Sequence, residues 1–191
     1  ATTSANSPSG RDGHTAVWTG TEMIVWGGSL VTGTTATNTG ARYLPAAGST
    51  TGAWTPTTTT TGAVPSPRSR HTAIWTGSAM IVWGGDIIGI GSTDSGARYT
   101  PGNGVGMDSW TATTATGAPS PRTNHTAVWT GSQMIIWGGL TASSGFAGDG
   151  GRYTPGASGG SWSTIVSTQI ISARDRHTAV WTGTEMIVWG G

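Results

Sequence analysis

The chain has 191 residues, a formal net charge of +1, nine arginines, no lysine and no cysteine. So small a net charge provides no electrostatic basis for binding nucleic acid or an anionic membrane surface, and the lack of cysteine excludes disulfides, thiolate metal sites and cysteine nucleophiles. Eleven tryptophans argue against a disordered chain. Low charge with many Thr, Ser and Gly residues favours a secreted or cell-surface protein.

Four copies of one sequence block recur along the chain. The first, RDGHTAVWTGTEMIVWGG, covers residues 11–28, and the last, at 174–191, differs from it at a single position. The copies between them cover 68–85 and 122–139. Internal repeats of this length are typical of repeat architectures. We therefore divide one domain, 1–191, into a terminal outer-strand segment, three repeats and a half repeat: 1–10, 11–67, 68–121, 122–173 and 174–191.

Each repeat predicts four short β-strands. HTAVW and MIVWGG are rich in β-branched and aromatic residues, and the Gly-containing connection between them predicts a hairpin. Both strands are apolar on both faces and therefore need cover on both sides. A third strand, ARYTP at 97–101 in the second repeat, ends at a proline, and a fourth, SWTAT, follows at 109–113. Such repeated four-stranded units predict the blades of a β-propeller, stacked face to face.

The recurring residues resemble the Kelch repeat, in which an apolar strand ends in Gly-Gly and is followed by a Tyr and then a Trp. The Gly pairs are 27–28, 84–85, 138–139 and 190–191, and the Tyr–Trp pairs are Tyr43–Trp54, Tyr99–Trp110 and Tyr153–Trp162. The resemblance covers nearly the whole chain. It implies an all-β, Kelch-type β-propeller with three complete four-stranded blades and one half blade. It also implies that the loops between second and third strands share one face with the segments linking the blades, where binding takes place.

Most His and Trp residues return at the same place in every repeat, which indicates packing or hydrogen bonding within the scaffold. This structural set comprises His14, His71, His125, His177, Trp18, Trp75, Trp129 and Trp181. All eleven tryptophans recur at repeat positions, and we expect them to be largely buried with paired indole N–H groups. The four named here should lie near the axis. Alternatively, a ring of histidines could bind a metal, and an exposed Trp could offer a platform for sugars. We predict no metal and no cofactor.

The arginines at the repeat junctions allow two interpretations. Arg68 and Arg122 follow proline-containing linkers, which cannot join a sheet ladder, so both are expected to donate to backbone carbonyls of a neighbouring blade. A guanidinium group also suits an anionic ligand. Arg70 and Arg176 share a position that is arginine in only two of the four copies, and they are therefore better candidates for a partner contact.

The segments that follow the Gly pairs differ among the repeats: SLVTGTTATNT, DIIGIGSTDS and LTASSGFAGD. Variable loops on a rigid scaffold are where recognition usually occurs. The candidate ligand or partner residues in and beside these segments are Asp86, Asp94, Phe146 and Asp149. They join the two arginines above as the predicted binding residues.

No catalytic residue is predicted. The Kelch-like galactose oxidase family needs a Cys-linked Tyr, and cysteine is absent. Glu22 and Glu185 occupy hairpin tips without a second carboxylate at a fixed distance, which glycosidases require. The sequence favours a non-catalytic scaffold that binds protein or glycan through its blade loops. A purely architectural propeller segment without a ligand is the alternative, and a secreted carbohydrate-active enzyme related to Kelch-type oxidases is a more distant one.

The repeat pattern also predicts self-assembly. Three blades and the inner hairpin of a fourth would leave the strand at 186–191 as an uncovered apolar edge, which is a template for another chain. We expect two copies to close one ring, a homodimer with two-fold symmetry, with residues 1–5 of one copy along the partner's edge strand. A single-chain four-bladed ring and a segment of a longer propeller are the alternatives.

Overall fold

The computed structural model describes residues 4–30, 35–46, 51–103, 106–143, 145–165 and 171–191. Within these ranges the chain forms β-strands and no helix, and so includes no helix able to cross a membrane. The expected all-β class is confirmed. Of the expected edge segment at 1–5, residues 1–3 lie outside the described ranges.

Three four-stranded antiparallel sheets and one hairpin follow each other along the chain. The first sheet has the order β2 (Thr15–Trp18), β3 (Met23–Trp26), β5 (Gly40–Leu44) and β6 (Ala53–Pro56). The second has β7 (Thr72–Trp75), β8 (Met80–Trp83), β11 (Gly96–Thr100) and β12 (Ser109–Ala112). The third has β13 (Thr126–Trp129), β14 (Met134–Trp137), β17 (Gly150–Thr154) and β18 (Ser161–Thr164). The terminal hairpin pairs β19 (Thr178–Trp181) with β20 (Met186–Trp189).

Short two-residue strands extend the sheets at one end. They are β1 (Arg11–Asp12) with β4 (Ser29–Leu30), β9 (Asp86–Ile87) with β10 (Gly91–Ser92), and β15 (Leu140–Thr141) with β16 (Gly145–Phe146). The proline-containing linkers that precede Arg68 and Arg122 belong to no strand, as expected from the missing backbone donor of proline. The tip glycines of the four principal hairpins have φ between 99° and 106°, a conformation that costs glycine least.

The Tyr and Trp of each repeat are direct partners across two strands. Tyr43 lies opposite Trp54, Tyr99 opposite Trp110, and Tyr153 opposite Trp162. The three pairs of rings have centroid separations of 4.9–5.2 Å and are tilted against each other, in the range favoured by aromatic pairs. The recurrent spacing between Tyr and Trp therefore encodes the register of the third and fourth strands.

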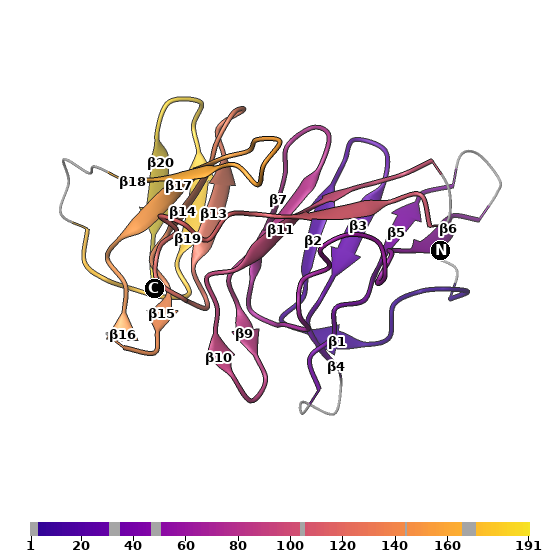
Figure 1. The fold of residues 1–191 in the computed structure, drawn as a ribbon, viewed down its shortest axis with the longest axis horizontal. Helices are drawn as coiled ribbons and strands as arrows, with labels where there is room; N and C mark the ends of the chain where they lie inside the picture. Colours follow the sequence, from indigo (N-terminus) through magenta and orange to yellow (C-terminus); the bar gives the residue numbers. More distant parts are fainter. Residues whose placement is uncertain (1–3, 31–34, 47–50, 104–105, 144, 166–170) are drawn as a thin grey trace.

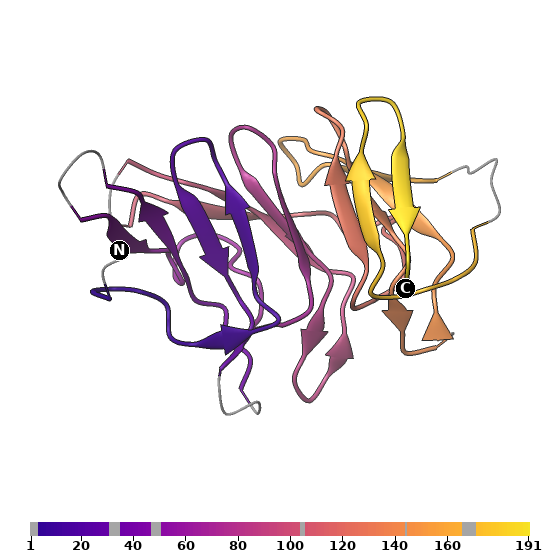
Figure 2. The same cartoon turned by 180° about the vertical axis from the view of Figure 1, so that it is seen from behind.

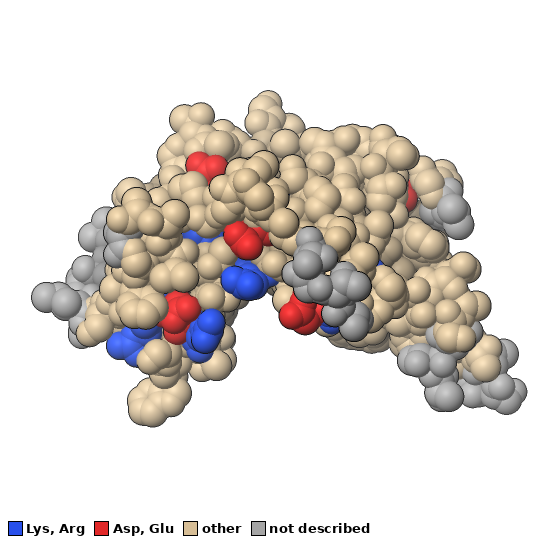
Figure 3. Space-filling model, turned by 90° about the horizontal axis from the view of Figure 1, so that it is seen from below, with Lys and Arg blue, Asp and Glu red and all other residues tan. Residues whose placement is uncertain are grey.

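The sheets stand side by side, and their first strands contact one another in succession. β2 contacts β7, β7 contacts β13, and β13 contacts β19, which Figure 2 shows as a row from indigo to yellow. The outer strands cross in front of this row in Figure 1. Seen from below, the molecule is an arch with a hollow side (Figure 3). The described residues form an open arc of sheets.

The hydrophobic core lies between the sheets. β8 is the clearest example, because all four of its side chains are buried. Met80 and Val82 pack with Ile24 and Trp26 of the first sheet. Ile81 and Trp83 point the other way and pack with Met134, Ile136 and Tyr153 of the third sheet. The second strands β8 and β14 are thus covered on both faces, as expected.

The tryptophans correct one expectation. Those of the first strands are not largely buried: Trp18 is 54% exposed, and Trp75, Trp129 and Trp181 are half-buried. The second-strand residues Trp26 and Trp83 are buried instead. A first strand is an edge strand with a paired strand on one side only, whereas a second strand lies inside its sheet, and Trp26 and Trp83 both point toward the sheet that follows.

The expected pairing of the indole N–H groups holds only in part. Trp110 donates to the carbonyl of Thr58 at 3.2 Å, and Trp162 donates to that of Thr114 at 3.0 Å. The Nε1 atoms of Trp26, Trp54 and Trp83 are buried without a hydrogen-bond partner. Two of these rings, those of Trp26 and Trp83, lie edge-on to histidine rings at 5.2 Å.

The Gly pairs allow the next sheet to approach. Gly84 and Gly85 have φ values of +69° and +97°, which side chains rarely adopt. A Cβ atom on Gly84 would lie 2.6 Å from Cε1 of His125, and one on Gly85 would lie 2.6 Å from the carbonyl oxygen of Ser69. The Gly-Gly element therefore serves the contact between repeats as well as the turn.

Candidate functional site

The junction arginines hold neighbouring sheets together. Arg68 is almost fully buried and donates through Nη1 to the carbonyls of Gly84 and Ser95 at 3.1 and 2.8 Å. Its own carbonyl accepts from the amide of Gly28 in the first sheet at 2.8 Å. Arg122 repeats the arrangement one unit later. The side chains do donate to backbone carbonyls, but these belong to the arginine's own repeat and not to a neighbouring blade as expected. Only the backbone carbonyl of the arginine reaches the preceding repeat.

The histidines connect the first strands. Nε2 of His71 lies 2.8 Å from Oγ1 of Thr15, and His125 and His177 make the same contact with Thr72 and Thr126. His14 is exposed. The expected hydrogen bond to the neighbouring repeat is thus present. The described residues hold no group of three or more His, Asp or Glu side chains able to bind a metal ion.

These histidines predict that stability falls in acid. Burial, and secondarily the nearby charge of Arg68, lowers the pKa of His71 to about 3, and burial with Arg122 does the same for the pKa of His125. The unfolded chain binds protons from about pH 6.5 downward, where the folded chain does not. Stability is therefore complete above pH 6.5 and is lost as the pH falls from there toward 3. Each buried histidine contributes a slope of at most about 1.4 kcal/mol per pH unit.

Denaturant unfolding at a series of pH values between 7.5 and 4.5 checks this expectation. His125→Gln should flatten the dependence of the unfolding free energy on pH. His14→Gln, at the equivalent but exposed position, is the matched control and should change the slope less than His125→Gln does. Equal slopes for the parent and His125→Gln would contradict a role of His125 in acid sensitivity.

The hairpins after the Gly pairs lie on one face of the molecule, at the bottom of Figure 1. Phe146, in β16, is exposed, and so are Ile88 and Ile90 at the turn between β9 and β10. The two isoleucines were missed by sequence reasoning, although the run DIIGIG contains them. Asp86 and Asp94 are half-buried in the same region. The amide and carbonyl of Asp86 pair with Ser69, so its backbone belongs to the scaffold.

Asp149 has a structural role that the sequence did not indicate. Its carbonyl accepts from Arg122 at 3.0 Å, just as the carbonyl of Ser95 accepts from Arg68. Its carboxylate also lies 2.9 Å from Nη2 of Arg122. Asp149 therefore completes the junction between repeats, and it is the first residue of the third-strand block rather than part of an independent loop.

Arg70 and Arg176 belong to one row of left-handed residues. Gly13, Arg70, Asn124 and Arg176 occupy the same place in the four repeats, with φ between 53° and 58°. Their backbones are linked: the amide of Arg70 donates to Gly13, that of Asn124 to Arg70, and that of Arg176 to Asn124. Both arginine side chains are exposed. Basic and acidic side chains gather around the hollow of the arch (Figure 3), and Asp175 lies 3.7 Å from Nε of Arg176.

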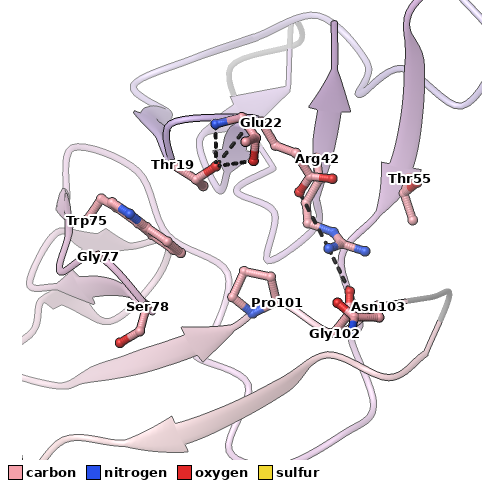
Figure 4. A pocket seen from close by; sticks show the side chains of 11 residues that line it. Thr19, Glu22, Arg42, Thr55, Trp75, Gly77, Ser78, Pro101, Gly102 and Asn103 are labelled. Carbon is pink, nitrogen blue, oxygen red and sulfur yellow. Dashed lines mark hydrogen bonds and ion pairs between the residues drawn. The ribbon is translucent and has the colours of Figure 1, made fainter.

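A pocket of about 670 Å³ lies at the opposite face, between the hairpin tips of the first two sheets and the loop after β11. Figure 4 shows its side chains. Trp75 and Ser78 come from the second sheet's hairpin, Glu22 from the first sheet's hairpin, and Arg42 from β5. The remaining lining residues are Thr19, Thr21, Thr55, Gly77, Pro101, Gly102 and Asn103.

Arg42 is the central polar group of this pocket. Its side chain is only 9% exposed, and Nη1 donates to the carbonyl of Gly102 at 2.8 Å and lies 3.5 Å from Oε2 of Glu22. Nε is buried without a hydrogen-bond partner. Arg42 thus connects two sheets. From the sequence, Glu22 was set aside as a site residue because no second carboxylate lies at a fixed distance from it. The sequence feature that places Glu22 near Arg42 is its position two residues before Ile24, the register partner of Arg42.

The same pocket recurs one repeat later in smaller form. Its volume is about 240 Å³, and it is lined by Thr76, Ser78, Ala79, Arg98, Trp129, Ser132 and Pro155. Each of these residues is the repeat equivalent of one in the larger pocket, but Ala79 stands where the first repeat has Glu22. The two pockets therefore share an Arg and a Trp and differ in the carboxylate.

No family model matches the chain. A partial match is found to a Drosophila melanogaster protein described as a leucine-zipper-like transcriptional regulator 1 homolog, with 43% identity over 75 residues. The aligned part covers 39% of this chain and 7% of that protein. The chain therefore spans a small fraction of this relative.

Proposed function

We propose that the chain is a unit of a Kelch-type β-propeller, a non-catalytic scaffold that completes a ring with a second copy and binds partners through its blade loops. Its three four-stranded sheets and one hairpin would be three blades and half of another. The Gly pairs against the next sheet, the Tyr–Trp partners and the contacts between successive first strands support this proposal. The exposed apolar side chains at the tips of neighbouring hairpins support a binding role.

The observation that carries the assembly is the open face of the terminal hairpin. Val180, Ile187 and Trp189 are 57%, 49% and 80% exposed. Their equivalents in the second sheet, Ile74, Ile81 and Trp83, are buried against the third sheet. The open face therefore has the side chains of an internal sheet interface without the sheet that covers them.

The opposite end of the arc offers the complementary surface. The first sheet exposes Trp18 on the side where the second sheet presents Met80, Val82 and Tyr99 to its predecessor. The chain thus carries both halves of the interface that it forms twice internally. Head-to-tail contacts of this kind end in a closed ring when the rotation permits, and two copies are the smallest such ring.

A second feature of the terminal hairpin supports the same proposal. A pocket of about 250 Å³ lies beside it, lined among others by Ile135, Trp137, Met186 and Val188. At the interface of the first two sheets, the third-strand Tyr99 and fourth-strand Trp110 pack beside the equivalent residues Ile24 and Trp26. Outer strands from a partner would occupy the equivalent place here.

Light scattering on the parent and two variants tests the assembly. The parent is expected at twice the chain mass of 19.3 kDa, and Trp189→Asp at the single mass, because a charge in this face would be buried without a partner. Phe146→Asp, an equally apolar-to-acidic change on a different exposed surface, should keep the double mass. A parent that is folded at the single mass would refute the dimer.

A further inference from the structure

We propose that the pocket around Arg42, Glu22 and Trp75 is a binding site for a neutral saccharide. This inference rests on the proposed role of the chain as a binding module, and it assigns that module a ligand class and a site. The site lies on the hairpin-tip face, opposite the variable loops that the sequence pointed to. Its volume of about 670 Å³ is within the range of about 300–1,000 Å³ common for small-molecule sites.

The charges of the pocket favour an uncharged ligand. Arg42 and Glu22 are the charged side chains that line it, and they lie 3.5 Å apart, so their charges compensate. An anionic ligand would have to compete with Glu22, and a cationic ligand with Arg42. A neutral ligand leaves the ion pair between Arg42 and Glu22 in place. It can still form strong hydrogen bonds, because hydrogen bonds to charged groups are stronger than those between neutral groups.

The hydrogen-bonding groups suit hydroxyls in particular. The guanidinium of Arg42 is donor-only and the carboxylate of Glu22 is acceptor-only, whereas a hydroxyl both donates and accepts. Two neighbouring hydroxyls of a sugar could therefore engage Arg42 and Glu22 together. Thr55, Ser78 and Asn103 add further polar groups at the rim.

An apolar surface faces these polar groups. Trp75 is half-buried, and its indole extends into the pocket near Pro101 (Figure 4). An aromatic side chain with one accessible face can cover the C–H face of a sugar ring while the ring's hydroxyls reach polar neighbours. Trp75 was expected from the sequence to be buried. Its exposed part instead contributes to the proposed site.

Comparison with the second pocket points to the carboxylate of Glu22 as the group required for saccharide binding. It keeps the Arg and Trp as Arg98 and Trp129, but Ala79 replaces the carboxylate, and its volume is about 240 Å³. It therefore lacks both the acceptor and the room of the first. We infer one saccharide site for each chain. Ala79, the equivalent of Glu22 in the second pocket, suggests Glu22→Ala as the substitution that should impair this site.

Titration of the full chain with neutral monosaccharides and β-linked disaccharides of glucose, galactose and mannose tests the site, by ligand-observed NMR and tryptophan fluorescence. We expect millimolar or tighter binding of at least one sugar. Glu22→Ala, which copies Ala79, should weaken that binding at least tenfold. Glu185→Ala, at the same tip position of the terminal hairpin, is the matched control and should bind like the parent. Trp75→Ala should remove the fluorescence response.

Two results would overturn the proposal: no sugar of the panel binds, or Glu22→Ala binds as tightly as the parent. Tighter binding of glucuronate or inorganic phosphate than of any neutral sugar would overturn the neutral class. Mass measurements on the same samples separate this proposal from the assembly. If the chain has the single mass and binds sugar, the saccharide site stands and the two-copy ring is refuted. If the chain has the double mass and binds no sugar, the ring stands and the saccharide site is refuted.

Discussion

Replacing Trp83 with alanine is expected to lower the free energy of unfolding by about 3–5 kcal/mol. The Trp83 side chain is fully buried. It packs between the second and third sheets, where its ring lies 5.2 Å from that of His125 and 5.3 Å from that of Trp162. Its removal leaves a cavity in an interface formed by strands that cannot close over it. Such a loss is a large share of the roughly 5–15 kcal/mol that stabilises a domain.

Urea unfolding measures this loss, and Trp189→Ala is the matched control. Trp189 occupies the same repeat position but is exposed, so its replacement should change the unfolding free energy little when the chain is dilute enough to be a single copy. Trp75→Ala should fall between the two, because Trp75 is half-buried; from the sequence alone it was expected to be a full core residue. A Trp83→Ala chain with the parent's unfolding midpoint would show that the sheet interface does not hold the fold together.

Arg122→Met is expected to destabilise the chain by about 3 kcal/mol or more. The guanidinium is fully buried and donates to the carbonyls of Gly138, Asp149 and Ser120 at 3.0 Å each. Methionine fills a similar volume but leaves these acceptors without a partner, and each unpaired buried group costs about 1–3 kcal/mol. Arg122→Lys should recover little, because an ammonium group lacks the planar fork that reaches two carbonyls at once.

Arg11 provides the control for this experiment. It donates to the carbonyls of Gly27 and Thr39, as Arg122 does to the equivalent residues, but it is only half-buried. Water can replace its bonds, so Arg11→Met should cost clearly less in the same thermal and urea unfolding measurements. Equal losses for the two variants would mean that burial of the junction arginine does not determine its contribution.

The repeat pattern alone determined the four main strands of each repeat and their order, but not the two-residue strands such as β9 and β10. The hairpins, the positive φ of the tip glycines and the pairing of Tyr99 with Trp110 depend on residues close in sequence, and the same signal returns in each copy. Local turn chemistry and β-propensity are therefore readable without coordinates. The bonds from Arg68 to backbone carbonyls could be expected for a related reason: an arginine recurs wherever the chain enters a new sheet, and Arg68 and Arg122 follow proline-containing linkers.

The burial of individual side chains and the position of the pocket depend instead on how the sheets pack against one another. Trp18 and Trp26 lie in equally apolar strands, yet one is exposed and the other is buried, because burial depends on the neighbouring sheet and not on the strand. The structural role of Asp149 follows from the hydrogen bond that its carbonyl accepts from Arg122, which the tertiary structure alone reveals. Glu22 and Trp75 come from the hairpins of two repeats and Arg42 from the middle of β5, and no local pattern joins them. Their pocket exists because adjacent sheets bring their hairpin tips together, which is a property of the tertiary structure.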